Sequence, residues 1–315
     1  MSATTAEPGQ TLLQTDELPG RSGGYGAQAL RRLTRQPLTL AALALLLALF
    51  ILGGLAHELA PQGWNAIDLS GRWQNHAPTL SGWHLFGTDN IGRDVLPRML
   101  WGLHDTEQAT LLGALLATLL GVAIGGLAGL YGGWLDATLM RFVDLVTSFP
   151  PIVLMIIAFF FLEPLTVWKA TAVFALYMWT QVARAVRARV TGLGGAEFVE
   201  AARALGASDT RLFFRHLLPN AAGTVVVAAT ALVGQIILIE ATAEFFGFGV
   251  NSLIRPTLGN LIADATTSGI GSYNQLGLGW WVWAGPAALL ALILISINLV
   301  GDGLNTALNP TTTRR

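Results

Sequence analysis

Two acidic residues, Glu240 and Glu244, stand four positions apart at the end of a long apolar run. On a helix this spacing places both carboxylates on one face, and acids within a membrane usually face a cavity because their exposure to lipid is costly. Both residues are therefore candidates for attracting a cation or binding an amine. Solvation at the membrane interface, or a structural hydrogen bond, is the alternative role.

Residue types exclude several other kinds of chemistry. The chain has no Cys, which excludes thiolate nucleophiles, disulfides and Cys-ligated metals. Its five His residues form neither an H-E-x-x-H motif nor an i, i+4 pair with an acid, so we expect no metal site built from this chain. No paired Ser, His or carboxylate set predicts a catalytic site, and we expect no catalytic residue.

ATP hydrolysis through a P-loop is also excluded for this chain. Lys169 is the only lysine, and no glycine-rich run precedes it. A P-loop requires its lysine inside G-x-x-x-x-G-K-[ST], where backbone N–H groups cradle the phosphates. We therefore expect no cofactor bound by this chain.

The composition is that of a membrane protein. Of 315 residues, 53% are hydrophobic and only 12% are charged, whereas about 25% are charged in an average soluble domain. The net charge is -1, with 18 Lys and Arg against 19 Asp and Glu. This balance gives no basic excess with which to hold a nucleic acid.

Apolar windows predict six membrane-spanning helices. A span needs about 20 mostly apolar residues, and windows of suitable length lie at 38–56, 108–135, 145–162, 164–183, 217–239 and 280–301. The fourth window is a span only if Lys169 extends its ammonium to the interface. Most Arg residues fall on one side of this arrangement, which places both termini in the cytoplasm.

The predicted organisation follows from these spans. We expect a mobile cytoplasmic tail at 1–36, a first transmembrane helix at 37–59 and an external loop at 60–106. A core of five further spans fills 107–310, and a short tail follows at 311–315. A charged cytoplasmic stretch at about 190–220 interrupts the core.

That charged stretch contains two predicted short helices. At 197–205, Phe198, Val199, Ala202 and Leu205 share one apolar stripe. Gly206 permits the turn that ends a helix, and a second helix is predicted at 210–218, closed by Pro219. The pattern fits either a helix lying on the membrane interface or a docking element for a partner protein.

The residues of this stretch resemble the EAA loop of permease subunits in ATP-binding-cassette importers. The motif is Glu200-Ala201-Ala202, then Gly206 and, after twelve intervening residues, Pro219. Further motifs in matching order are 87–94, 132–150, 246–250, 259–264 and 298–304. From about Trp83 to Pro310 the chain is similar to the second permease of dipeptide, oligopeptide and nickel importers.

The resemblance implies an all-α membrane protein with the type I importer permease fold, six transmembrane helices and cytoplasmic termini. It implies a cytoplasmic (inner) membrane location, a homologous second permease, an external substrate-binding protein, and two ATPase subunits that hold ATP and Mg. The implied cargo is short peptides, moved by alternating access. Nickel, haem, glutathione or another small solute remains an alternative cargo, and a stand-alone secondary transporter is a more distant alternative.

The resemblance also assigns roles to individual residues. ATPase coupling is implied for Glu200, Ala201, Ala202, Arg203, Gly206 and Pro219. Glu240 and Glu244 become candidates for the translocation pathway. Asp89, Arg93 and Asp94, in the external segment, either hold that segment against the spans or contact the binding protein.

Overall fold

A computed structural model of the chain describes residues 25–67, 76–80, 84–89, 91–163, 165–249, 255–267 and 279–308. Residues 1–24 of the expected tail, and the expected tail at 311–315, lie outside this part. Within the described residues the structure is helical, and two isolated β-bridges pair Ile67 with Arg93 and Thr88 with Asp94. The all-helical membrane fold expected from the sequence is therefore confirmed.

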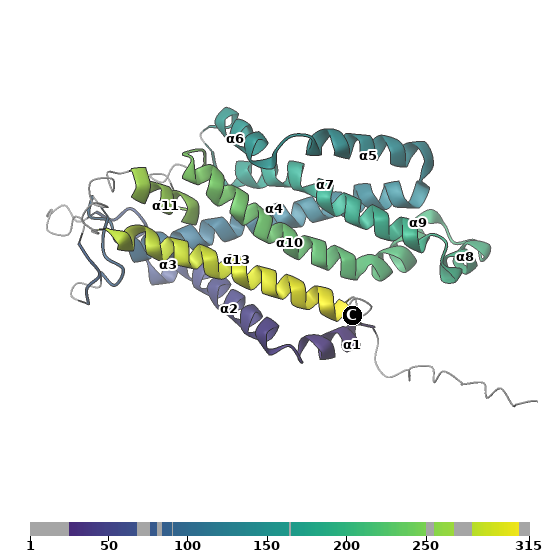
Figure 1. Cartoon of the computed structure of the whole chain (residues 1–315), viewed down its shortest axis with the longest axis horizontal. Coiled ribbons are helices and arrows are strands. Elements are labelled where there is room, and N and C mark those ends of the chain that lie inside the picture. The colour runs from purple at the N-terminus through teal and green to yellow at the C-terminus, as the bar shows by residue number, and fades with distance from the viewer. Residues whose placement is uncertain are drawn as a thin grey trace, which may run out of the picture.

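Four continuous helices are long and apolar enough to cross a membrane. They are α2 (Pro37–Gly54), α4 (Val95–Tyr131), α13 (Trp280–Leu308), and the stretch in which α9 (Asp209–Leu212), a π-helical turn η2 (Phe213–Leu217) and α10 (Leu218–Phe245) follow one another. Figure 1 shows α4, α10 and α13 running along the same long axis. Each of these helices contains one of the predicted apolar windows or most of it.

The predicted span at 145–162 is a bent pair of helices. Helix α5 (Gly133–Thr147) and α6 (Pro151–Phe161) meet at an angle of 78°. Pro151 occupies the first position of α6, where its missing N–H leaves no helical bond broken. The break arises because residues preceding a proline avoid helical backbone angles. Two prolines, Pro150 and Pro151, follow one another at this point.

Helix α7 (Val167–Leu193) covers the fourth predicted window but is not among the helices apolar enough to qualify as a span. It packs along α4, where a Cβ atom on Gly121 would lie 2.5 Å from the Cβ atom of Val182. Val182, Phe174 and Met178 are fully buried. Because neighbouring helices shield α7, its low hydropathy is tolerated. Four to five candidate spans result, and the count of six stays a prediction.

Helix α4 begins at Val95, inside the segment expected to be an external loop. The Asp94 carboxylate accepts a hydrogen bond from the Leu96 N–H, at 3.1 Å, and so caps the helix. The first turns of α4 are buried and carry Arg98, Asp105 and Glu107. Because of these charged residues, the first turns of α4 contain no apolar window, and the sequence did not predict them as part of a spanning helix.

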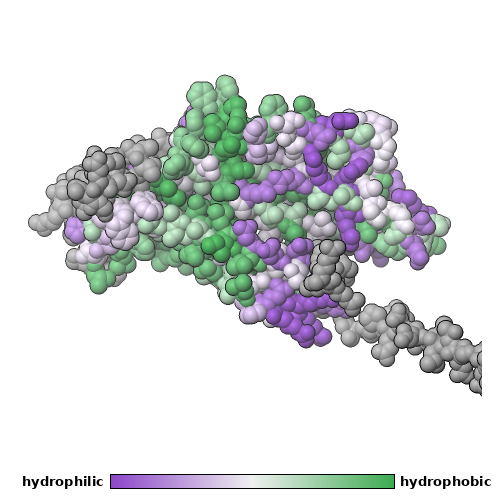
Figure 2. All heavy atoms as spheres, in the orientation of Figure 1, coloured by the Kyte–Doolittle hydropathy of each residue, from purple (hydrophilic) through white to green (hydrophobic). Residues whose placement is uncertain are grey.

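The two ends of the bundle differ in composition. Helix α1 (Tyr25–Leu33), the end of α13 and α8 (Glu197–Ala204) lie toward one end, while α3 (Ala56–Leu59) and α11 (Leu258–Thr267) lie toward the other (Figure 1). Figure 2 shows hydrophobic residues gathered in a band across the bundle and hydrophilic residues toward the α8 end and around α1. This banding is the pattern that a bilayer requires.

Candidate functional site

Helix α8 is the helix that the sequence predicts at 197–205. It ends in a Schellman motif, in which Gly206 N–H donates to the Arg203 carbonyl (2.9 Å) and Ala207 N–H to the Ala202 carbonyl (3.0 Å). Gly206 has φ +78°, a conformation that costs any residue with a Cβ about 1–2 kcal/mol. The glycine therefore sets the angle between α8 and the following helix.

The apolar stripe of α8 divides between two faces. Val199 and Ala202 are buried against the rest of the chain and belong to its largest hydrophobic cluster. Phe198 and Leu205 are 41% and 89% exposed. An exposed leucine and phenylalanine beside a buried anchor form a surface suited to a partner protein, whereas a helix lying flat on a membrane would turn its whole stripe one way.

The charged residues of α8 lie on its exposed side. Glu200 and Arg203, as well as Ala201, are exposed. The ion pairs formed by the described residues include none between Glu200 and Arg203. Both charges are therefore available to a partner surface.

The sequence predicted that the second short helix ends at Pro219. This prediction is wrong, because the helix continues past the proline. Ser208 caps α9 by accepting a hydrogen bond from Arg211 N–H at 3.4 Å. The chain then continues through the π-helical turn η2 into α10, with Pro219 in the first turn of α10. The widened turn accommodates the proline, and the Asn220 side chain donates to the His216 carbonyl at 2.6 Å. One continuous helix, 209–245, thus joins the α8 region to the far end of the bundle.

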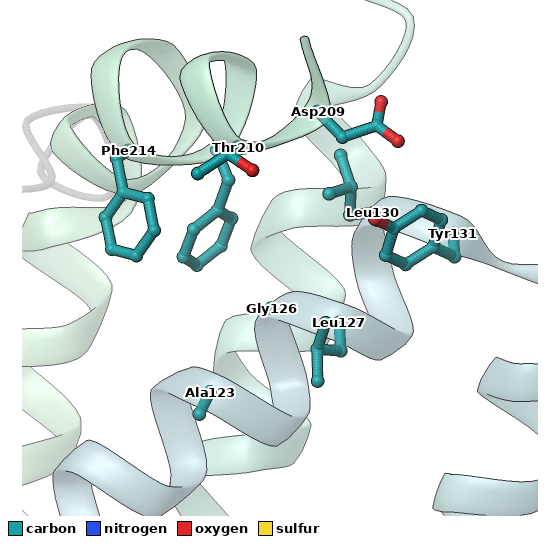
Figure 3. A pocket seen from close by; sticks show the side chains of 9 residues that line it. Ala123, Gly126, Leu127, Leu130, Tyr131, Asp209, Thr210 and Phe214 are labelled. Atoms are coloured by element: carbon teal, nitrogen blue, oxygen red, sulfur yellow. The ribbon is translucent and has the colours of Figure 1, made fainter.

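A groove of about 240 Å³ lies between the last turns of α4 and the α9–η2 segment (Figure 3). Its lining is mostly apolar and consists of Ala123, Gly126, Leu127, Leu130, Tyr131, Asp209, Thr210, Phe213 and Phe214. A Cβ on Gly126 would lie 2.5 Å from the Phe213 ring. The glycine therefore lets η2 pack closely against α4.

At the other end of the bundle, Asp89 and Arg93 are buried and paired with each other. Arg93 Nε lies 2.6 Å from Asp89 Oδ2, and Arg98 Nη1 lies 3.0 Å from the same oxygen. Arg98 also pairs with Asp264 of α11, at 3.0 Å. Because this network is buried, its geometry favours the fold-holding role over contact with an external protein.

Asp94 does not pair with Arg93. Besides capping α4, its carboxylate lies 3.4 Å from His84 Nδ1. Burial raises the pKa of the Asp94 carboxyl, against the opposing effects of the Leu96 N–H and of His84. Its side chain keeps 24% of its surface exposed, so among the three external candidates it is the most accessible.

Glu240 and Glu244 are both buried inside the chain, at the end of α10 far from α8. The Glu244 carboxylate accepts a hydrogen bond from the Thr257 hydroxyl, which is the structural role considered for it. Oxygen Oε2 of Glu240 has no hydrogen-bond partner among the described residues. The two acids, expected to act alike, therefore differ in their environment.

Sequence reasoning did not pair Arg98 with Asp264 or Asp105 with Arg255. Arg255 Nη1 lies 3.0 Å from Asp105 Oδ1. Both pairs join residues on α4 to the segment around α11, more than 140 positions later, and no local spacing announces such a contact. In the part of the chain that the structure describes, no three His, Asp or Glu side chains are placed to hold a metal ion.

Comparison with known proteins identifies the family. The family model described as "Binding-protein-dependent transport system inner membrane component" matches residues 121–314. A protein of Brucella suis biovar 1 (strain 1330) named as a peptide permease is 36% identical over 246 residues, 78% of each chain. The oligopeptide transport system permease protein OppC of Mycobacterium bovis is 33% identical over 288 residues, covering 89% of this chain and 92% of the relative.

A third relative has a similar name. The dipeptide transport system permease protein DppC of Bacillus subtilis (strain 168) is 30% identical over 299 residues, covering 94% of this chain and 89% of the relative. The matched family region contains α8, the continuous helix 209–245 and the buried acids of α10. The chain is a multi-pass membrane protein and belongs to the family of inner membrane components of binding-protein-dependent transport systems.

Proposed function

We propose that this chain is one of two transmembrane subunits of an ATP-driven importer of short peptides. Family membership supports transport that depends on a binding protein. The names of the relatives, which describe peptide, oligopeptide and dipeptide permeases, support peptides as the cargo. A homologous permease, an external binding protein and two ATPases that hold ATP and Mg complete the proposed complex.

The observation that carries the coupling role is the split surface of α8. Its buried side, Val199 and Ala202, anchors it to the bundle, while Phe198 and Leu205 are exposed for a partner. We propose that this exposed side of α8 binds in a groove of an ATPase subunit. Closure of two ATPases would then move α8, and the continuous helix 209–245 would carry that movement to the opposite end of the bundle.

Within this proposal, Glu240 is the stronger pathway candidate of the two acids. Its unpartnered oxygen is available to a cation or an amine, whereas Glu244 is engaged by Thr257. Asp94 is the external residue proposed to contact the binding protein, because Asp89 and Arg93 are engaged in the buried network.

The test is ATP-driven uptake by the reconstituted complex. Proteoliposomes containing both permeases and both ATPases, supplied with peptide-loaded binding protein, are expected to accumulate peptide only with ATP inside. Gly206→Val is expected to leave ATP hydrolysis but reduce uptake at least about tenfold, because a β-branched residue is strained at φ +78° and changes the angle of α8.

Gly195→Ala is the matched control. Gly195 precedes α8, has open space where a Cβ would stand and lacks a positive φ, so uptake should stay at the wild-type level. Normal peptide-stimulated uptake by the Gly206→Val complex would refute the coupling role. Peptide uptake by this chain alone, without ATP, would refute the importer and favour a secondary transporter.

A further inference from the structure

Asp105 is a buried acid with an incomplete set of partners. It lies in α4, near the end of the bundle opposite α8, and its side chain has no exposed surface. Oδ1 pairs with Arg255 Nη1 at 3.0 Å, and Oδ2 has no hydrogen-bond partner in the described ranges. An ionised carboxylate in such a place needs a cation and further donors.

Arg255, the cation paired with Asp105, is partly accessible to solvent. Arg255 precedes α11 in a short stretch without regular structure, and 38% of its side-chain surface is exposed. Its guanidinium carbon stands 5.7 Å from the centre of the Trp64 ring, in cation–π geometry. One carboxylate and one aromatic face therefore hold this cation, and solvent reaches it from the other side.

The aromatic face is firmly supported. Trp64 meets Trp101 edge to face, with ring centroids 5.0 Å apart, and Trp101 in turn contacts His57 and His104 at 5.5 and 5.9 Å. Trp101 is itself buried. The Trp64 ring is therefore held by a packed cluster and does not depend on Arg255 for its position.

Separation of the ion pair would destabilise Asp105 and Arg255 to different extents. A buried charge that loses its partner is strongly destabilised, whereas a partly exposed arginine regains water and loses little. Glu240, on the facing helix α10, is close enough to Asp105 for the two carboxyl groups to interact electrostatically. If Arg255 moves away, Asp105 and the Trp64 ring remain in place, and the carboxylate then either binds another cation or takes up a proton.

We infer that Asp105 and the Trp64 ring form a subsite for a primary ammonium group, in which the guanidinium of Arg255 is an internal surrogate that the ligand displaces. A carboxylate beside an aromatic face is the chemistry that recognises an alkylammonium ion. The identification of this group as the amino terminus of a peptide rests on the proposed function. The binding of an ammonium ion at this subsite does not rest on the proposed function.

The test is chemical rescue of a variant that lacks the surrogate. Arg255→Ala is introduced into the complete importer complex, and its Tm is measured with increasing ethylammonium chloride. We expect the variant to have a lower Tm than the wild type and ethylammonium to raise it by about 2–4 °C. Potassium chloride at the same ionic strength should not raise it, because K⁺ cannot donate hydrogen bonds to the carboxylate.

Two further variants locate the effect. Arg255→Ala combined with Asp105→Asn should show no ethylammonium rescue, because the acceptor is then neutral. Arg255→Gln, which keeps the length of most of the side chain, replaces Arg255→Ala if the latter complex does not assemble. Equal stabilisation by potassium, or rescue that persists in the double variant, would overturn the subsite.

Transport supplies the second measurement. With binding protein saturated by peptide, Asp105→Asn should reduce the preference of the complex for a free amino terminus over an N-acetylated one by about tenfold, the value of one charge-assisted hydrogen bond. An unchanged preference together with successful ammonium rescue would leave the subsite and overturn the peptide assignment. Absence of all ATP-driven peptide uptake would instead refute the proposed function.

Discussion

Ion pairs in this protein fall into two classes that the residue types alone do not distinguish. The pair between Arg184 and Asp144 is about half exposed, at 2.8 Å, whereas Arg98 is 2% exposed and bridges Asp89 and Asp264. Exposed pairs contribute about 0–1 kcal/mol because water screens them. A buried charge that loses its partner costs several times as much, so the two classes should respond very differently to truncation.

Truncation of Arg98 is therefore expected to destabilise the protein. Arg98→Ala leaves Asp264 without this partner and opens a cavity between α4 and α11, and we expect the free energy of unfolding to fall by about 3 kcal/mol. Arg184→Ala, the matched control, should change it by less than about 1 kcal/mol. Thermal unfolding of the detergent-solubilised protein measures both. Equal effects of the two substitutions would show that the Arg98 network is not a stabilising core.

At the scale of elements, α8 presents two faces with separate tasks. Val199 is fully buried against the bundle, and Phe198 and Leu205 are exposed. The buried side should determine whether the element folds, and the exposed side should determine whether a partner binds. Substitutions on adjacent residues of one short helix can therefore separate stability from assembly.

The double substitution Phe198→Ser with Leu205→Ser is expected to weaken ATPase binding without destabilising the permease. Both side chains are exposed in the permease, so Tm should change by no more than about 1–2 °C, while recovery of ATPases with the tagged permease in mild detergent should fall at least about tenfold. Val199→Ser should instead lower Tm, because it places a hydroxyl in a hydrophobic cluster. Undiminished ATPase recovery with the double variant would contradict docking through this face.

Most of the spanning helices could be predicted because an apolar run of sufficient length has few alternatives in a membrane. Helix α8 and its glycine turn could be predicted because their signals are local. The course of the chain past Pro219 could not, since a π-helical turn absorbs the proline. The start of α4 was missed because buried ion pairs, formed with residues distant in sequence, permit charges in its first turns.

The same distinction applies to the candidate site. The position of α8 and the shared location of Glu240 and Glu244 on α10 followed from spacing. Which of the two acids is hydrogen-bonded depends on Thr257, in a separate segment. Partners that are distant in sequence leave no periodic signal, so the chemistry of the end opposite α8 became visible only in three dimensions.

The molecule as a whole is polarised along its long axis. Helix α8 and the basic helix α1 lie toward one end of the bundle (Figure 1). The ion pairs formed by Asp89, Arg98 and Asp105 lie toward the other end. If basic segments remain in the cytoplasm, α8 lies on the cytoplasmic side, where the proposed ATPases would bind, and the opposite end lies on the side of the proposed binding protein. This orientation is the condition on which every proposed partner depends.

Single cysteines test this orientation directly, because the native chain has none. Gln28→Cys and Ser208→Cys place a thiol at exposed positions of the α1 and α8 end, and Leu80→Cys places one at a position 88% exposed near the start of α4. In intact cells whose outer membrane has been permeabilised, a maleimide that cannot cross the inner membrane should label only Leu80→Cys. Lysis before labelling, the control for reactivity, should make all three react. Labelling of Gln28→Cys and Ser208→Cys before lysis would invert the orientation, and labelling of only one of them would place α1 and α8 on opposite sides of the membrane.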